Sequence, residues 1–291
     1  MLESTAALLT GVLDYAGTYP PASLPLADAL RNYRTTIEGA HRQLVGRLVI
    51  PTANLAALQR LADAASHEPW PVTAILGADL SPSIETVTAH HAASHQNTPI
   101  MSVEVPPVAA TEIRTIKRRL PSDLDVFFEV PIDADFERRV GAIASVAACA
   151  KVRTGGVAST AFPTSQGLAR VITQCADAGI PFKATAGLHH AVRGCYRLTY
   201  EPDSPEAIMH GFLNVCAAAA VVYAGAGPRD VDEVLAESSA DAFRFDEGAL
   251  RWRGWEIRTA DLAAARSHLF RSFGTCSLAE PIEELERLQL V

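Results

Sequence analysis

The chain has 291 residues, 48% of them hydrophobic, and a formal net charge of −8 at pH 7. This composition supplies one large hydrophobic core and excludes a nucleic-acid-binding surface built on a basic stripe. The five cysteines are odd in number and have no CxxC spacing, which argues against a disulfide framework and favours a reducing, cytoplasmic environment. The N-terminal stretch carries acidic rather than basic residues, so we expect no signal peptide.

Eight short apolar runs are predicted to be strands. In chain order they are "LLTGVLDYAG", "RLVIP", "VTAILG", "IMSVEVP", "DVFFEVP", "CAKVRTGG", "PFKATAG" and "FRSFGTCS", and several end at Pro or Gly, which stops a strand. Segments with helical spacing, such as "SQGLARVITQCADAG", lie between them. This alternation predicts parallel pairing and a single (β/α)8 TIM-barrel domain over residues 1–291. An open doubly wound sheet is the alternative, but no GxGxxG follows the first strand.

The regular spacing breaks between the seventh and eighth strands, where residues 190–268 form an insertion. Its apolar run from Ala207 to Gly227 contains His210 and Asn214 and is predicted to be a buried helix rather than a membrane span. The following "FRFDEGALRWRGWEI" is predicted to be a β-hairpin turning at 246–248. Because the insertion follows strand seven, we expect it over the C-terminal face of the barrel, as a lid, as padding of the rim or as a subunit contact in a homo-oligomer.

Two lysines occupy similar apolar strands, in "AKVRTGGV" and "PFKATAGLHH". Lysine is rarely buried without a reason, and alternate residues of a strand face the same way. We therefore expect Lys151 and Lys183 to point into the barrel near its mouth, with Arg153 on the face of Lys151. Two ammonium groups close together lower each other's pKa, which would yield a neutral amine able to attack a carbonyl. Alternatively, each lysine binds an anion or forms an ion pair.

These two runs, with three others in the same order, resemble those of deoxyribose-phosphate aldolase, a family of class I (Schiff-base) aldolases on a (β/α)8 barrel. The other three are "GVLDYAG", "SVEVP" and "FRSFGTCSLAEPIEEL". The resemblance implies a lyase of carbohydrate metabolism in which Lys151 forms the imine, Lys183 lowers its pKa and Glu104 moves protons through a water, with no cofactor. It also implies that backbone amides between Gly274 and Ser277 bind an anion.

Departures from the family's pattern bear on the substrate. His189 and His190 follow Gly187 where the family has a second glycine, so one side of the phosphate cradle is altered. Arg153 replaces a serine, and a guanidinium can grip a carboxylate or phosphate. Glu104 stands where the family has an aspartate, one methylene shorter. We therefore expect a small carbonyl compound other than deoxyribose 5-phosphate, such as a keto acid or an acidic sugar.

Glu129 and Arg153 have two interpretations each. Glu129, at the end of the fifth strand, is expected to be the counter-ion of Lys151 or an acid/base group. Arg153 could instead pair with Glu129 or with Asp14. The candidate substrate-binding residues are Asp14, Arg153, Thr154, Glu129, His189, His190, Gly274, Thr275 and Ser277.

Two other function classes stay open. One is a metal-assisted lyase or isomerase that uses Glu104, Glu129, His189 and His190. We expect no metal, because adjacent residues of a strand point to opposite sides. The other class is a barrel that has lost catalysis and binds a small anion. The expected partner is a small carbonyl compound, and neither nucleic acid nor a membrane is expected to bind.

Overall fold

Eight parallel strands close into a barrel in the computed structural model, which describes residues 1–64 and 68–291. Their order around the barrel is β1-β13-β7-β6-β5-β4-β3-β2. Each of the eight predicted runs overlaps one of these strands, so the predicted (β/α)8 TIM barrel is confirmed. The strands are β1 (Leu13–Tyr15), β2 (Val45–Pro51), β3 (Val72–Ile75), β4 (Ile100–Val105), β5 (Asp125–Glu129), β6 (Cys149–Arg153), β7 (Phe182–Thr185) and β13 (Phe270–Thr275).

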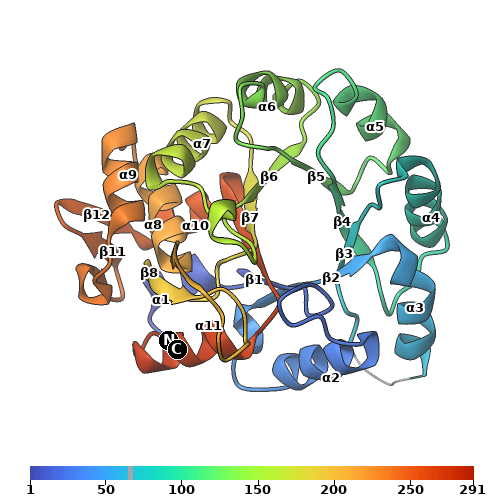
Figure 1. The fold of residues 1–291 in the computed structure, drawn as a ribbon, viewed down its shortest axis with the longest axis horizontal. Coiled ribbons are helices and arrows are strands. Elements are labelled where there is room, and N and C mark those ends of the chain that lie inside the picture. The colour runs from blue at the N-terminus through green and yellow to red at the C-terminus, as the bar shows by residue number, and fades with distance from the viewer. Residues whose placement is uncertain (65–67) are drawn as a thin grey trace.

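Amphipathic helices surround the barrel, which Figure 1 shows in a view down its axis. Helix α7 illustrates the pattern, because its apolar residues, including Leu168 and Ile172, face the strands and the Thr164 hydroxyl caps its first turn by accepting from Gly167 N. The helices of this ring and at the N-terminus are α1 (Glu3–Leu9), α2 (Leu26–Ile37), α3 (Leu55–Asp63), α4 (Leu80–Ala92), α5 (Ile113–Arg119), α6 (Phe136–Ala144), α7 (Ser165–Asp177) and α11 (Ala279–Arg287).

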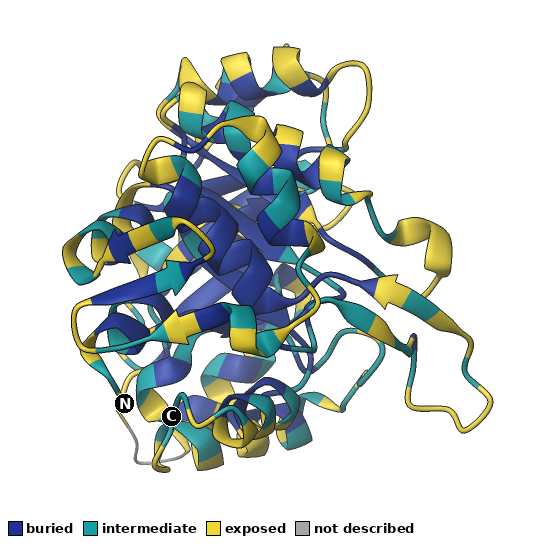
Figure 2. Ribbon diagram, turned by 90° about the vertical axis from the view of Figure 1, so that its left-hand side faces the viewer, coloured by how far each residue is buried: buried dark blue, intermediate teal, exposed yellow. Residues whose placement is uncertain are grey.

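The barrel strands are buried on both faces, which is why their sequences are almost continuously apolar. On β5, the successive residues Phe127 and Phe128 are both 1% exposed. Phe128 packs in the layer between strands and helices, whereas Phe127 lies in the barrel interior, under the ammonium group of Lys183. Figure 2 shows the buried strands at the centre and exposed residues on the outer helix faces.

Residues 190–268 form several elements between β7 and β13. The predicted hairpin at "FRFDEGALRWRGWEI" is instead a three-stranded antiparallel sheet, because a second tight turn at Arg253 and Gly254 pairs Trp252 with Trp255. The elements are β8 (Gly194–Arg197), β9 (Glu206–Met209), α8 (Phe212–Tyr223), α9 (Pro228–Ala236), β10 (Phe243–Phe245), β11 (Ala249–Trp252), β12 (Trp255–Arg258) and α10 (Thr259–His268).

Most of this segment lies beside the barrel. Helix α8 is the buried helix predicted from the apolar run, and it packs between α7, α9, α10 and β13. Strands β11 and β12 pack against α10, and β11 also contacts α1. The hairpin of β8 and β9 is the part that reaches the C-terminal rim, where its Tyr200 binds Glu280 of α11. In the described part of the chain, no helix is long and apolar enough to cross a membrane.

Candidate active site

Four neighbouring strands bring the charged residues of the barrel interior together. Glu104 comes from β4, Glu129 from β5, Lys151 from β6 and Lys183 from β7. The register places Glu129 beside Lys151 and Lys151 beside Lys183. Register partners on adjacent parallel strands project to the same side of the sheet. The predicted placement of both lysines in the barrel interior is therefore correct.

The two lysines share one carboxylate. Lys151 Nζ lies 2.7 Å from Glu104 Oε2, and Lys183 Nζ lies 2.7 Å from Glu104 Oε1. Lys151 Nζ also lies 2.9 Å from Glu129 Oε2, which makes Glu129 a counter-ion of Lys151. Each ammonium group is thus held by two carboxylates, with Glu104 as the bridge.

Asp14 is the other carboxylate that binds Lys183. Its Oδ2 lies 2.6 Å from Lys183 Nζ and accepts a hydrogen bond from the Ser272 hydroxyl at 2.7 Å, while its Oδ1 accepts from Arg47 N at 2.9 Å. The side chains of Asp14 and Lys183 are 2% and 1% exposed. Neither residue lines the pocket at the barrel mouth. Asp14, a predicted substrate-binding residue, is therefore a buried partner of Lys183.

The electrostatics of this network differ from the expectation for the lysine pair. Burial opposes ionisation of Glu104, but the two ammonium groups outweigh it and lower the pKa of Glu104 to about 2. Burial likewise disfavours the ammonium form of Lys151, but Glu104 and Glu129 outweigh it and raise the pKa of Lys151. The pKa of Lys183 is raised in the same way by Asp14 and Glu104. The expected lowering of the pKa of Lys151 by Lys183 is absent, because three carboxylates surround two lysines.

A pocket of about 360 Å³ opens above this network at the C-terminal mouth. Lys151, Glu104 and Glu129 line this pocket, whereas Lys183, whose side chain is 1% exposed, does not. Tyr19 also lines the pocket, and burial followed by the charge of Glu104 raises the pKa of its phenol. Of the three predicted catalytic residues, Lys151 and Glu104 are therefore accessible to a small molecule.

Arg153 lines the same pocket, two residues beyond Lys151. Among the described residues, no carboxylate lies within 4.0 Å of its guanidinium, so it forms neither the ion pair with Glu129 nor the one with Asp14. Arg153 also faces a neighbouring pocket of about 390 Å³ beside Phe162 and the start of α7. The guanidinium is thus placed to bind an anion.

Only some of the residues predicted to bind the substrate at the ends of β6 and β13 line the pocket. Gly274 and Thr275 line the pocket, but Ser277 does not. The Ser277 amide is directed at Thr275 Oγ1 at 3.3 Å, which leaves it less free for an anion. Thr154 is fully buried, and its hydroxyl donates to Ala186 O at 2.7 Å, which joins the ends of β6 and β7. Thr154 therefore stabilises the strand ends rather than lining the pocket.

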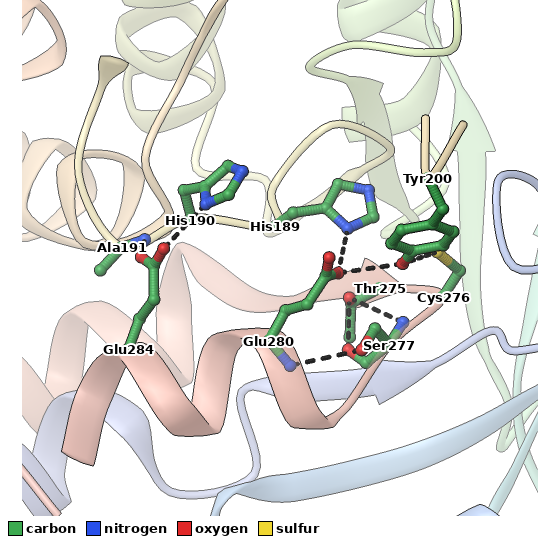
Figure 3. A network of polar contacts seen from close by, with 9 residues as sticks. All are labelled: His189, His190, Ala191, Tyr200, Thr275, Cys276, Ser277, Glu280 and Glu284. Carbon is green, nitrogen blue, oxygen red and sulfur yellow. Dashed lines mark hydrogen bonds and ion pairs between the residues drawn. The ribbon is translucent and has the colours of Figure 1, made fainter. Parts of the chain in front are cut away.

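The two adjacent histidines differ in their surroundings (Figure 3). His189 lines the pocket, and its Nδ1 lies 2.9 Å from Glu280 Oε2. His190 does not line the pocket; its Nδ1 lies 2.8 Å from Glu284 Oε1, and its ring stacks on Tyr196. Of the two histidines predicted to position the substrate, only His189 lies in the pocket, and its contact with a substrate stays a prediction. Gly187 allows this turn, because its φ of +76° is readily adopted only by glycine.

The residues of the metal-assisted alternative are not gathered around one point. Glu104 and Glu129 bind Lys151, while the two histidines bind glutamates of α11. Over residues 1–64 and 68–291, no group of three or more His, Cys, Asp or Glu residues is arranged to hold a metal ion.

Sequence reasoning did not single out Glu280 or Tyr200, which complete the surroundings of His189. Glu280 and Glu284 lie four residues apart, so they share one face of α11, and this spacing was the available signal. That this face meets the two histidines depends on packing between segments about ninety residues apart.

Compared with protein-family models and with curated proteins, the chain gives no match.

Proposed function

We propose that the protein is a class I aldolase-type lyase, similar to deoxyribose-phosphate aldolase, in which Lys151 forms a Schiff base with a small aldehyde or keto compound. The observation that carries the proposal is the position of Lys151, whose Nζ lies between two carboxylates in a pocket at the barrel mouth. In (β/α)8 enzymes the active site lies at this C-terminal end of the strands.

The proposed reaction begins at the neutral amine of Lys151. Its lone pair attacks the carbonyl carbon, and the resulting carbinolamine takes up a proton from water and loses water to give a protonated imine. The hydroxyl on the second carbon beyond the imine carbon then loses its proton to water and becomes a carbonyl. The bond between the first and second carbons breaks, and its electron pair moves into the imine to leave an enamine. Protonation of the enamine carbon and addition of water then release the product and restore the amine.

The carboxylates around Lys151 have two opposite effects on this chemistry. Glu104 and Glu129 stabilise the ammonium form, so only a small fraction of Lys151 is neutral near pH 7. The same two carboxylates stabilise the positive charge of the protonated imine once it forms. We infer an enzyme whose imine forms slowly at neutral pH and is held strongly afterwards.

Arg153 suggests the class of substrate. Its guanidinium has no carboxylate partner among the described residues and lies two positions along β6 from Lys151. Two residues of a strand span about 7 Å, which suits a molecule with a carbonyl at one end and an anionic group at the other. A keto acid or an acidic sugar has this form.

The experiment is reductive trapping. Wild type and Lys151→Ala are incubated with a panel of small aldehydes and keto acids, reduced with borohydride and weighed intact by mass spectrometry. An adduct that is present in wild type and missing in the variant supports the proposal, and its mass identifies the compound. If no compound of the panel gives an adduct with wild type, the proposal fails.

One observation favours a second candidate, a barrel that binds a small anion without catalysis. Both lysines are held as ammonium groups by buried carboxylates, which is also how a purely structural ion network is built. Such a barrel would bind an anion through Arg153 and give no covalent adduct. The trapping experiment therefore separates the two candidates.

A further inference from the structure

A histidine–glutamate pair stands at the rim of the pocket that contains Lys151. His189 lines this pocket, and its Nδ1 lies 2.9 Å from Glu280 Oε2. The same oxygen accepts a hydrogen bond from the Tyr200 hydroxyl at 3.1 Å. Figure 3 shows the Glu280 carboxylate between these two side chains, so the carboxylate and the ring it binds are held in one orientation.

This contact determines which nitrogen of His189 carries the proton. Burial opposes ionisation of Glu280, but the hydrogen bond and charge of His189 outweigh it, so the pKa of Glu280 is lowered. An ionised carboxylate only accepts hydrogen bonds, so Nδ1 of His189 is the donor. In the neutral ring the lone pair then resides on Nε2, which Figure 3 shows turned away from Glu280.

The carboxylates nearest Lys151 are poor candidates for moving protons. Both oxygens of Glu104 are taken by lysines, and a carboxylate with a pKa of about 2 rarely takes a proton from a carbon acid. Glu129 is also paired with Lys151. His189 differs from these carboxylates. Its partner Glu280 binds Nδ1 and leaves Nε2, the basic nitrogen of the ring, open to the pocket.

We propose that His189, oriented by Glu280, transfers a proton between Nε2 and the carbon next to the imine on Lys151. The inference rests on the proposed Schiff base. In one direction the C–H bond of the imine breaks, its proton goes to Nε2 and its electron pair forms the C=C bond of the enamine, while the imine nitrogen becomes neutral. In the other direction the imidazolium returns the proton to that carbon.

Other histidines make similar pairs with α11 outside the pocket. His190 binds Glu284, and His41 Nε2 lies 2.8 Å from Glu286 Oε1. A hydrogen bond between a histidine and a glutamate of α11 can therefore have a purely structural role. Access to the pocket distinguishes His189, and His41 supplies a matched control.

The test uses pyruvate as the probe, because it has a ketone, a carboxylate for Arg153 and exchangeable methyl protons. Exchange of these protons for deuterium is followed by proton NMR in D2O, and the imine is trapped in parallel with borohydride. General acid–base groups typically contribute about 100-fold or more. We expect His189→Gln to keep the trapped adduct and to lose about 100-fold or more in exchange rate, whereas His41→Gln keeps both.

Two further variants guard against a simple folding defect. Glu280→Gln and Tyr200→Phe leave the ring in place and remove its orientation, so both are expected to slow exchange less than His189→Gln and to leave trapping intact. Unchanged exchange in a folded His189→Gln that still forms the adduct would overturn the inference and make Glu129 the base. Absence of any adduct in wild type would overturn the proposed Schiff base and the role of His189 with it.

Discussion

The ammonium groups of Lys151 and Lys183 are held by the two oxygens of one carboxylate, each at 2.7 Å from Glu104. A shared carboxylate converts two like charges, which would repel each other, into a bridged network. Lys151, the proposed nucleophile, is therefore held mainly as the protonated ammonium group. This property leads directly to the pH dependence of the proposed reaction.

Imine formation is expected to accelerate steadily with pH. Because the pKa of Lys151 is raised above its ordinary 10.5, the neutral amine increases about tenfold per pH unit throughout the range from about pH 6 to about pH 9. Short incubations with pyruvate at each pH, followed by reduction at one fixed pH, measure the rate. A rate that levels off near neutral pH would indicate a lowered pKa and contradict the description of the network.

Glu129→Gln is expected to speed imine formation at neutral pH. The change removes a negative charge 2.9 Å from Lys151 Nζ that favours the ammonium form, so the pKa of Lys151 is lowered. Trapping near pH 7 should then be several-fold faster, on the order of the effect of one close charge on a neighbouring amine. Glu137→Gln, at an exposed ion pair with Arg170, is the control and should leave the rate unchanged. Slower trapping in Glu129→Gln would instead identify Glu129 as the proton acceptor of Lys151.

Arg153→Gln is expected to weaken binding of carbonyl compounds that carry a carboxylate. Loss of one charge-assisted hydrogen bond raises the pyruvate concentration for half-maximal trapping by about tenfold or more. Methyl pyruvate, which lacks the negative charge, should be trapped equally well by both proteins. Equal losses for the acid and the ester would show that Arg153 supports the pocket rather than binding the anion.

Asp14→Asn is expected to destabilise the barrel strongly. The change leaves Lys183 buried with one carboxylate instead of two, and removing one partner of a buried ion pair costs about 3–5 kcal/mol. Urea unfolding followed by circular dichroism measures this loss. Asp28→Asn, which breaks an exposed pair with Arg31, should change the free energy of unfolding little. Similar small effects of both changes would argue against a structural role for Asp14.

Acid should remove the stabilisation that Glu104 supplies. Its pKa is lowered from 4.5 to about 2, so the contribution is complete above pH 4.5 and is lost as the pH falls from there toward 2. This difference corresponds to about 3 kcal/mol of unfolding free energy. Urea titrations at several pH values should show this decline in wild type and in Glu85→Gln, and a shallower one in Glu104→Gln. Equal declines in Glu104→Gln and wild type would contradict the lowered pKa.

Much of the fold could be predicted from the sequence, because a strand buried on both faces is a short apolar run that ends at Pro or Gly. The alternation along β6 and β7 likewise placed Lys151, Lys183 and Arg153 correctly. The single hairpin predicted for this segment omits the third strand of the β10–β12 sheet, because Arg253 and Gly254 form a second tight turn.

The electrostatics of the site could not be predicted from spacing. Lys151 and Lys183 are close, as expected, but the sign of each pKa change depends on which carboxylates reach between them. Likewise, Glu280 meets His189 only because α11 packs beside the rim. Both results come from contacts between distant segments, which a local pattern does not encode.

Mapping the trapped adduct tests the central claim most directly. The chain contains three lysines, Lys117, Lys151 and Lys183, so a peptide digest after pyruvate and borohydride treatment separates every lysine candidate from the others and from the N-terminal amine. The proposed function predicts an adduct on Lys151, with Lys117 on the outer helix α5 as the measure of non-specific labelling. An adduct on Lys183, or labelling of Lys151 no greater than that of Lys117, would contradict it.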